Sequence, residues 1–385
     1  MRIALVSGSF LPRVGGLEWK VHYLATEYVK RGHEVIVFTS RPRISFEPVR
    51  LPVETSYRVI RCGIPLPGFG RLSIAKYAFC KTIKKHHRLH AFDVLHCHHL
   101  GFPSQVGATL KSVIGVPVVA TTCGADVQIV PEINYGERLS PRLDRIVRDN
   151  LKKVDVVGSI SSSVRTDLEG MQPCARIVDI PNGVPWDEFQ TGPSKLLRTR
   201  LNLGPETIII LSVGRNHIKK GYDLGIRAFA RVAKYFEHAH YILVGRNTET
   251  LTPLVEDCGM KGRVHLVGQV PFQEVSQVFH SADVFFNPSL VEGFAQVNAQ
   301  ALASGLPCVL TDAPGNVDAA DYGGALIAKA GDIEMMASIL IQLLGNSQNR
   351  ETLGREAHAA SKRYAWEKIA DEYLHIFEGL CKPTR

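Results

Sequence analysis

The feature that most constrains this chain is an alternation, in which short apolar runs and amphipathic stretches of helical length follow one another from end to end. This pattern is typical of β-α units, whose parallel strands form a buried sheet covered by the intervening helices. Strands are predicted at 3–7, 35–39, 93–97, 116–121, 154–159, 176–180, 208–213, 240–244, 264–266, 284–287 and 308–311. Helices are predicted at 17–31, 221–235 and 294–304, the first of them ending at Gly32.

The length of 385 residues corresponds to two domains of ordinary size, at roughly 100–200 residues per domain. Proline, glycine and asparagine cluster between 181 and 195, which indicates a junction there. Ligands of doubly wound sheets bind in a crevice at the carboxyl ends of the strands. The cleft between the two domains is therefore the expected site.

The composition is that of a soluble globular protein, with 45% apolar and 21% charged residues. No apolar run approaches the roughly 20 residues that span a bilayer, and the N-terminus reads as a first strand rather than a signal peptide. A cytoplasmic location is expected, with peripheral association at the inner face of the membrane as a further hypothesis. The net charge of +8 permits an anionic partner without naming one, and no nucleic-acid partner is expected.

The cysteines and histidines do not indicate a metal site. The eight cysteines include no C-x-x-C pair, which argues against a zinc ribbon and a disulfide scaffold. In the run His96-Cys97-His98-His99, a strand would place His96 and His98 on one face with Cys97 pointing away, and no carboxylate partner is evident. No metal is expected, and the first loop lacks the glycine motifs of ATP and dinucleotide sites.

A basic stretch predicts an amphipathic helix over 72–90. No acidic residue lies between Glu54 and Asp93. The cations of this interval are Arg58, Arg61, Arg71, Lys76, Lys81, Lys84, Lys85 and Arg88, and the apolar residues of the predicted helix include Ile74, Tyr77, Ala78 and Ile83. The helix is either an ordinary solvated face or a docking surface for an anionic membrane or a phosphorylated acceptor.

The most informative segment is 288–307, where a strand ends, a turn carries Glu292 and Gly293, and a helix is expected to open near Phe294. The backbone N–H groups of Phe294, Ala295 and Gln296 would lie unpaired at the helix N-terminus, which suits a phosphate. A carboxylate beside them suits a ligand that also offers hydroxyl groups, such as a nucleotide-linked sugar. An ordinary loop with a capping glutamate remains the alternative.

The same segment resembles the motif of two glutamates separated by seven residues in glycosyltransferase family 4, whose members are retaining enzymes of the GT-B class. Further segments resemble the family in the same order along nearly the whole chain: Val14-Gly15-Gly16-Leu17-Glu18, Lys30-Arg31-Gly32-His33-Glu34-Val35, Asp93-Val94-Leu95-His96-Cys97-His98, Pro181-Asn182-Gly183-Val184, Val213-Gly214-Arg215, Lys219-Lys220-Gly221 and Tyr364-Ala365-Trp366. The resemblance implies two Rossmann-like doubly wound parallel-sheet domains that face a cleft.

In family terms, residues 1–185 form an acceptor-binding domain, which the C-terminal helix 366–385 rejoins, and residues 186–365 form the nucleotide-sugar domain. The resemblance implies a nucleoside-diphosphate sugar as donor substrate, UDP- or GDP-linked, without a metal cofactor. The acceptor is expected to be a saccharide of the cell envelope, a polysaccharide or a lipid-linked acceptor.

The resemblance implies a role for each residue that stands in one of the family's motifs. Arg215 and Lys220 would bind the donor diphosphate, whose charge grows as it leaves, and Gly15 and Gly16 would let the backbone approach its phosphates. Glu292, implied as a catalytic residue together with Asp126 and Cys123, would bond donor-sugar hydroxyls or stabilise the reacting face. The remaining site residues that the resemblance implies are Gly293, Phe294, Ala295, Gln296, Gln300 and Arg246 for the donor, Glu18 and Gly124 on the acceptor side, and Asp126 and Cys123 beside the reacting groups.

Two residues depart from the family pattern. Cys123 stands where the family has a histidine that contacts the donor sugar, and cysteine is only a weak donor. Gln300 stands in place of the second glutamate, and its amide accepts with one atom only. These departures leave open an alternative function, a degenerate GT-B partner that binds without catalysis. A GT-B sugar phosphorylase is a third candidate, without a clear signature for its pyridoxal cofactor.

Overall fold

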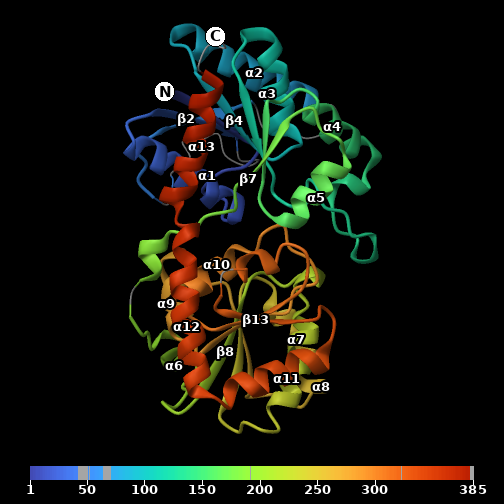
Figure 1. Ribbon diagram of the computed structural model, residues 1–385, viewed down its shortest axis with the longest axis vertical. Coiled ribbons are helices and arrows are strands. Elements are labelled where there is room, and N and C mark those ends of the chain that lie inside the picture. The colour runs from blue at the N-terminus through green and yellow to red at the C-terminus, as the bar shows by residue number, and fades with distance from the viewer. Residues whose placement is uncertain (42–50, 52, 64–70, 191, 322, 382–385) are drawn as a thin grey trace. The chain divides into compact units, whose positions relative to one another are not determined.

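The computed structural model describes residues 1–41, 51, 53–63, 71–190, 192–321 and 323–381. The chain divides into two compact units (Figure 1). Unit 1 comprises Met1–Asn182 and Trp366–Arg385, and unit 2 comprises Gly183–Ala365. The last helix of the chain thus belongs with the first half of the sequence.

Unit 1 is built on a parallel sheet, seven-stranded in its described part, in the order β3-β2-β1-β4-β5-β6-β7. Its strands are β1 (Arg2–Ser7), β2 (Glu34–Ser40), β3 (Arg58–Cys62), β4 (Val94–His98), β5 (Val118–Thr121), β6 (Val156–Ser159) and β7 (Arg176–Asp179). Its helices are α1 (Gly16–Lys30), α2 (Arg71–Leu89), α3 (Phe102–Ile114), α4 (Pro141–Leu151), α5 (Ser162–Gly170) and α13 (Trp366–Cys381). Every residue of β1 is buried, as expected of a central parallel strand.

Aromatic contacts attach α13 to α1. Tyr23 stacks on Trp366 with ring centroids 5.9 Å apart, and Tyr28 meets Phe377 edge to face. The guanidinium of Arg31 donates to the Asp371 carboxylate. Burial of the Tyr28, Trp366 and Phe377 rings explains why α13 packs on α1.

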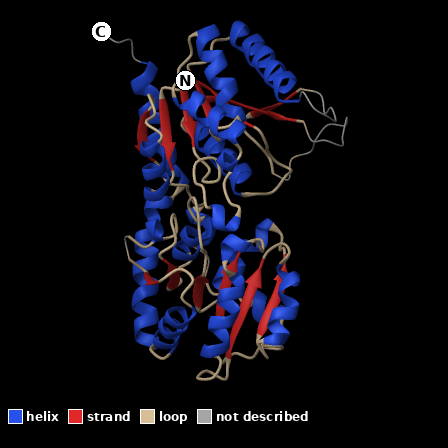
Figure 2. Ribbon diagram, turned by 90° about the vertical axis from the view of Figure 1, so that its right-hand side faces the viewer, coloured by secondary structure: helices blue, strands red, loops and turns tan. Residues whose placement is uncertain are grey.

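Unit 2 repeats the design with a parallel sheet, six-stranded among the described residues, in the order β10-β9-β8-β11-β12-β13. Its strands are β8 (Ile208–Val213), β9 (Ala239–Val244), β10 (Val264–Gly268), β11 (Val284–Asn287), β12 (Cys308–Thr311) and β13 (Ala325–Ala328). Its helices are α6 (Leu196–Arg200), α7 (Tyr222–Val232), α8 (Thr252–Asp257), α9 (Val275–His280), α10 (Gln296–Ala303), α11 (Ile333–Leu344) and α12 (Ser347–Ser361). Helices lie on both faces of this sheet (Figure 2).

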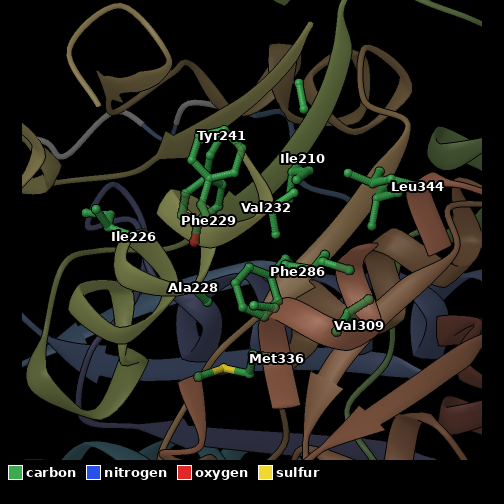
Figure 3. Close-up of a cluster of buried hydrophobic side chains, with 14 of the residues drawn as sticks. Ile210, Ile226, Ala228, Phe229, Val232, Tyr241, Phe286, Val309, Met336 and Leu344 are labelled. Atoms are coloured by element: carbon green, nitrogen blue, oxygen red, sulfur yellow. The ribbon is translucent and has the colours of Figure 1, made fainter. Parts of the chain in front are cut away.

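A hydrophobic cluster in unit 2 lies between the sheet and helices α7 and α11. Phe229, Tyr241 and Phe286 lie close together in it, with Met336 of α11 nearby (Figure 3). The Tyr241 and Phe286 ring centroids are 5.9 Å apart, and both side chains are fully buried. This packing fixes β8, β9 and β11, the strands that lead into the loops described below.

The predicted strands are confirmed within two residues at each end, and the structure adds two that were not predicted. Both are edge strands. β3 carries Arg58 and Arg61 and is only partly buried, so its sequence lacks an apolar run. β13 is short and rich in alanine. Edge strands need little apolar sequence because one side lacks a neighbouring strand.

Helix α2 confirms the prediction of a helix over 72–90. Phe79 and Ile83 are fully buried, whereas Ile74 and Tyr77 are 56% and 67% exposed. The apolar residues of α2 therefore divide between a buried and an exposed side of the helix. In the described part of the chain, no helix is both long and apolar enough to cross a bilayer.

Replacing Phe286 by alanine should destabilise unit 2 by about 3–5 kcal/mol, because the substitution removes a fully buried ring and leaves a cavity. Urea denaturation of the whole chain measures this. Tyr235→Ala is the control, since Tyr235 is 71% exposed and its loss should cost less than about 0.5 kcal/mol. Equal effects of the two substitutions would refute the assignment of this core.

Candidate active site

Glu292 lies at the centre of the site in unit 2 and is bonded to two lysines. It belongs to the loop between β11 and α10, and its side chain is 6% exposed. Its Oε1 lies 2.5 Å from Nζ of Lys220, and its Oε2 lies 3.0 Å from Nζ of Lys219. The Ser289 hydroxyl lies 3.0 Å from Oε1 as well. Each carboxylate oxygen is thus engaged by a cation.

The two lysines come from the loop that follows β8, the strand beside β11. The sheet order reverses between β8 and β11, so their carboxyl ends form the crevice where ligands of such sheets bind. The backbone N–H of Leu290 donates to the Lys219 carbonyl oxygen at 2.7 Å. Gly221 ends the lysine turn with φ 58°, and a Cβ there would collide with the Pro288 carbonyl oxygen. Only glycine allows the two loops to approach so closely.

A buried network of three asparagines holds the loop that carries Glu292. Asn287 Nδ2 donates to Oδ1 of Asn298 at 2.7 Å and to Oδ1 of Asn316 at 3.0 Å. Asn298 Nδ2 also donates to Oδ1 of Asn316 at 2.7 Å. The three amides join the end of β11 to α10 and to the loop after β12. Because buried amides must be satisfied, this network holds the loop in one arrangement.

The loop after β12 also contacts the Glu292 backbone. The Glu292 N–H donates to the Pro314 carbonyl oxygen at 2.8 Å. Gly315 has φ 72°, and a Cβ on it would collide with the Glu292 carbonyl oxygen. Three loops, after β8, β11 and β12, therefore position one carboxylate.

The electrostatics favour an anionic ligand. Burial alone would raise the pKa of Glu292, but Lys220 and Lys219 outweigh it and lower the pKa to about 2. The carboxylate is therefore ionised at neutral pH. Burial is the main cause that lowers the pKa of His217, and the nearby charges of Arg215 and the two lysines lower it further. Three cations around one carboxylate leave an excess of positive charge.

Helix α10 begins later than predicted. It starts at Gln296 rather than near Phe294, and Ala295 is its N-cap. The Ala295 N–H donates to the Gly315 carbonyl oxygen at 3.4 Å, so the prediction that this group lies unpaired was wrong. The loop geometry imposed by Gly315 delays the helix, which a hydrophobic pattern does not reveal. Gly293 and Phe294 are buried in the loop itself.

The other predicted donor residues of unit 2 lie around this loop. Arg215 and Arg246 are both exposed, and their loops are joined by a bond from the Asn216 N–H to the Arg246 carbonyl oxygen, 2.8 Å long. Gln300 is half-buried on α10, one helix turn beyond Gln296. Gln296 donates through Nε2 to the Gly183 carbonyl oxygen at 3.4 Å.

The predicted residues of unit 1 lie at the carboxyl ends of its strands. Gly15 precedes α1 with an extended backbone, and a Cβ on it would lie 2.6 Å from Oε2 of Glu18. Glycine at 15 thus makes room for the buried Glu18 carboxylate, which accepts from the Ser9 hydroxyl at 2.5 Å. Gly16 is the exposed first residue of α1, and Gly124 has φ 91°, which favours glycine.

Asp126 is fully buried and serves the backbone of unit 1. Its Oδ1 accepts from the Cys123 N–H at 2.9 Å, and its Oδ2 accepts from the Leu100 N–H at 2.8 Å. His99 lies beside it; burial opposes the charged ring, but Asp126 and Glu137 raise its pKa to about 9. Asp126 therefore ties the loop after β5 to the loop after β4. The half-buried Cys123 is held in place by this bond.

Two features of the site were missed from the sequence. Lys219, the second partner of Glu292, is adjacent to Lys220, and the pair of lysines was the available signal. No sequence pattern indicated the network of Asn287, Asn298 and Asn316, because these residues are separated along the chain. Within the described residues, no group of three or more histidine, cysteine, aspartate or glutamate side chains is arranged to hold a metal ion.

Comparisons with known proteins match both halves of the chain. The model of "Glycosyltransferase Family 4" matches residues 14–188, and that of "Glycosyl transferases group 1" matches residues 194–360. The chain belongs to glycosyltransferase family 4. The family resemblance of the sequence motifs is thereby confirmed, and the chain is a glycosyltransferase.

Relatives cover nearly the full length. The phosphatidyl-myo-inositol mannosyltransferase of Mycobacterium leprae is 28% identical, over 99% of this chain and 97% of its own. A D-inositol 3-phosphate glycosyltransferase of Xylanimonas cellulosilytica is 27% identical, over 96% of this chain and 92% of its own.

Solved structures share the fold. Sucrose-phosphate synthase of Thermosynechococcus elongatus has a TM-score of 0.82 at 21% identity and covers 98% of both chains. HepE of Anabaena, solved in complex with UDP-glucose, has a TM-score of 0.77 at 20% identity, covering 98% of this chain and 100% of its own. The GT-B fold expected from the sequence is confirmed.

The Glu292 ion pairs predict an acid-dependent loss of stability. The folded-state pKa of about 2 lies below the ordinary 4.5, so the stabilisation is complete above pH 4.5 and is lost progressively as the pH falls from 4.5 through 2. The stability advantage of wild type over Glu292→Gln should shrink by about 1 kcal/mol between pH 5.5 and 3.5. Calorimetric melting at several pH values measures it.

Exposed Glu249→Gln in the same unit is the matched control and should give a difference from wild type that stays flat over this range. A Glu292→Gln difference that is equally flat would contradict the paired, ionised state of Glu292.

Proposed function

We propose that the chain is a retaining glycosyltransferase that moves a sugar from a UDP- or GDP-linked donor to an envelope, polysaccharide or lipid-linked acceptor. The observation that carries the proposal is Glu292 held between Lys219 and Lys220 at the carboxyl ends of β8 and β11. A carboxylate that accepts from sugar hydroxyls beside cations that bind phosphate suits one ligand class, a sugar linked to a nucleoside diphosphate.

In this proposal unit 2 binds the donor. Lys220 and Arg215 bond the diphosphate oxygens, and their charges stabilise the negative charge that builds up as the glycosidic bond breaks. Arginine offers a planar fork of donors to two oxygens at once, while the lysine ammonium acts as a point charge. Glu292 holds the lysines in place and accepts from hydroxyl groups of the sugar. Gln296 and Gln300 line the nucleotide side.

The proposed stereochemical outcome is retention. The acceptor hydroxyl attacks the anomeric carbon on the face from which the diphosphate departs, and a departing phosphate oxygen takes its proton. The protein's part is to orient the substrates and to stabilise charge. Asp126 acts indirectly within unit 1, by fixing the backbone at Cys123.

The acceptor is proposed to bind unit 1 and to be anchored at a membrane. The relative named phosphatidyl-myo-inositol mannosyltransferase supports a lipid acceptor. Helix α2 supports membrane contact. Its exposed residues include Ile74, Tyr77, Lys81, Lys85 and Arg88, which follow one another at intervals of three or four residues and therefore share one face. Exposed apolar and basic side chains on one helix face suit an anionic bilayer surface.

A partner subunit that binds without catalysis is not favoured. Transferase family models match both halves of the chain, and the cation cluster around Glu292 has little purpose in a scaffold.

Lysine 220 is expected to determine donor affinity. One of the four nucleotides UDP, GDP, ADP and dTDP should stabilise the chain by about 2.7 kcal/mol when its concentration is a hundred times its Kd. A thermal-shift assay measures this stabilisation. Lys220→Met should reduce that affinity about tenfold or more, because a charge-assisted bond to phosphate is lost. Exposed Lys234→Met in the same unit is the control and should leave it unchanged. Identical affinities of all three proteins would refute the site.

The anomeric configuration of the product tests retention. With the donor that binds and a panel of polyol and lipid-linked acceptors, NMR of the product should show the donor's own anomeric configuration. An inverted product would disprove the mechanism while leaving the donor site intact.

Glutamine substitution of Lys81, Lys84, Lys85 and Arg88 together should weaken binding to vesicles containing anionic lipid, because each cation near the surface contributes about 1 kcal/mol. Vesicle co-sedimentation measures binding, and neutral vesicles serve as control. Unchanged binding to anionic vesicles would remove the proposed docking surface.

A further inference from the structure

Unit 1 contains a buried ammonium group with too few hydrogen-bond partners. Lys20, in the second turn of α1, is 3% exposed. Among the residues that the structure describes, its Nζ donates one hydrogen bond, 3.5 Å long, to the Thr122 carbonyl oxygen. An ammonium has three N–H groups to donate. A buried charge so poorly bonded is strongly unfavourable unless another group completes its contacts.

Lys20 also has no counter-ion of its own within the described ranges. Burial lowers its pKa to about 8, although Cys123 and Asp126 act in the opposite direction. Both oxygens of Asp126 already accept backbone N–H groups, and its charge faces the protonated His99, whose Nδ1 is 4.0 Å away. Burial raises the pKa of the Cys123 thiol, so it stays neutral. The ammonium keeps a positive charge that its surroundings do not balance.

A buried imidazole beside Lys20 is unsatisfied as well. His98 is fully buried, and neither of its ring nitrogens has a hydrogen-bond partner in the described structure. Its ring centroid lies 4.2 Å from that of His96. His96 differs, because its nitrogens are bonded to Tyr28 at 3.3 Å and Thr121 at 2.7 Å. Burial, His96 and then Lys20 lower the pKa of His98, so this ring is neutral and has one N–H to donate.

The position of these two groups in the sheet is that of a ligand site. His98 ends β4, and Thr122 follows β5, so both lie at the carboxyl edge of the unit 1 sheet. The strand order reverses between β1 and β4, beside this point. Cys123, next to Thr122, is half-buried, which brings the cluster close to the surface.

We infer that Lys20 and His98 form a recognition site for an anionic group, a carboxylate or a phosphate, carried by one of the two sugar substrates. This inference rests on the proposed function. The anion would accept from the ammonium and from the His98 N–H, and its charge would balance that of Lys20. A neutral hydroxyl would supply bonds but no counter-charge, so the site should discriminate strongly between charged and neutral ligands. Lys20 would then determine which substrates the enzyme accepts.

The test measures preference for a charged over a neutral probe in two arms. The acceptor arm compares inositol 1-phosphate with myo-inositol. The donor arm compares a nucleoside-diphosphate glucuronate with the matching glucose compound, on the base that the wild-type chain binds. Calorimetric titration of the full chain gives the four affinities for wild type, Lys20→Met, Lys20→Arg and His98→Gln.

In one arm, the wild type should prefer the charged probe by about tenfold or more. Lys20→Met should reduce the preference to within about twofold while the neutral probe binds as before, and Lys20→Arg should keep most of it. His98→Gln should reduce it in part. The arm that responds identifies the substrate that carries the anion.

If Lys20 has only a structural role, Lys20→Met should weaken the binding of charged and neutral probes alike. If a water molecule completes the contacts of Lys20, the wild type should show no preference for the charged probe in either arm. Either result overturns the inference, as does a preference that survives in Lys20→Met. Lys368→Met, which removes an exposed cation of α13, is the matched charge control. The affinity for the nucleoside diphosphate is measured in the same titrations with wild type and Lys220→Met, and it tests the proposed function separately.

If Lys20→Met fails to fold, Lys20→Arg and His98→Gln still test the inference. Only an anion site makes the affinities of these two variants differ for the charged probes and not for the neutral ones.

Discussion

The bond of Glu292 to Lys219 and Lys220 is the interaction on which the candidate site depends. A buried carboxylate costs free energy unless it is paired, and here two cations from a neighbouring loop pair with it. The cost of burial is met only because three loops at the carboxyl ends of β8, β11 and β12 meet closely. Gly221 and Gly315 permit that approach, and the asparagine network keeps it in one geometry. The positive charge left over is what a diphosphate requires.

Most of the fold followed from the sequence because its determinants are local. Buried parallel strands are short apolar runs, and glycine marks the ends of helices, so the order of elements could be read directly. The unpredicted strands β3 and β13 lie at sheet edges, where partial exposure removes the apolar pattern. The sequence could not show which apolar side chains of α2 are exposed, because Ile74 and Tyr77 are apolar residues of the helix just as the buried Ile83 is.

The candidate site was predictable in outline and not in its bonding. Glu292, Lys220 and Arg215 stand in motifs, so their positions could be anticipated. The bonding depends on contacts between loops that are distant in sequence. Glu292 bonds both lysines, the Ala295 N–H bonds the Gly315 carbonyl oxygen, and Asp126 accepts backbone N–H groups. The unsatisfied Lys20 and His98 belong to the same class, since burial and missing partners have no signal in a linear sequence.

The cations around Glu292 are proposed to bind a diphosphate. The most direct measurement is calorimetric titration with the nucleoside diphosphate that binds most tightly and with its parent nucleoside. We expect the diphosphate to bind about a hundredfold more tightly, equivalent to about 2.7 kcal/mol. Raising the salt concentration should reduce this difference. Equal affinities of nucleoside and nucleoside diphosphate would contradict a diphosphate site around Glu292.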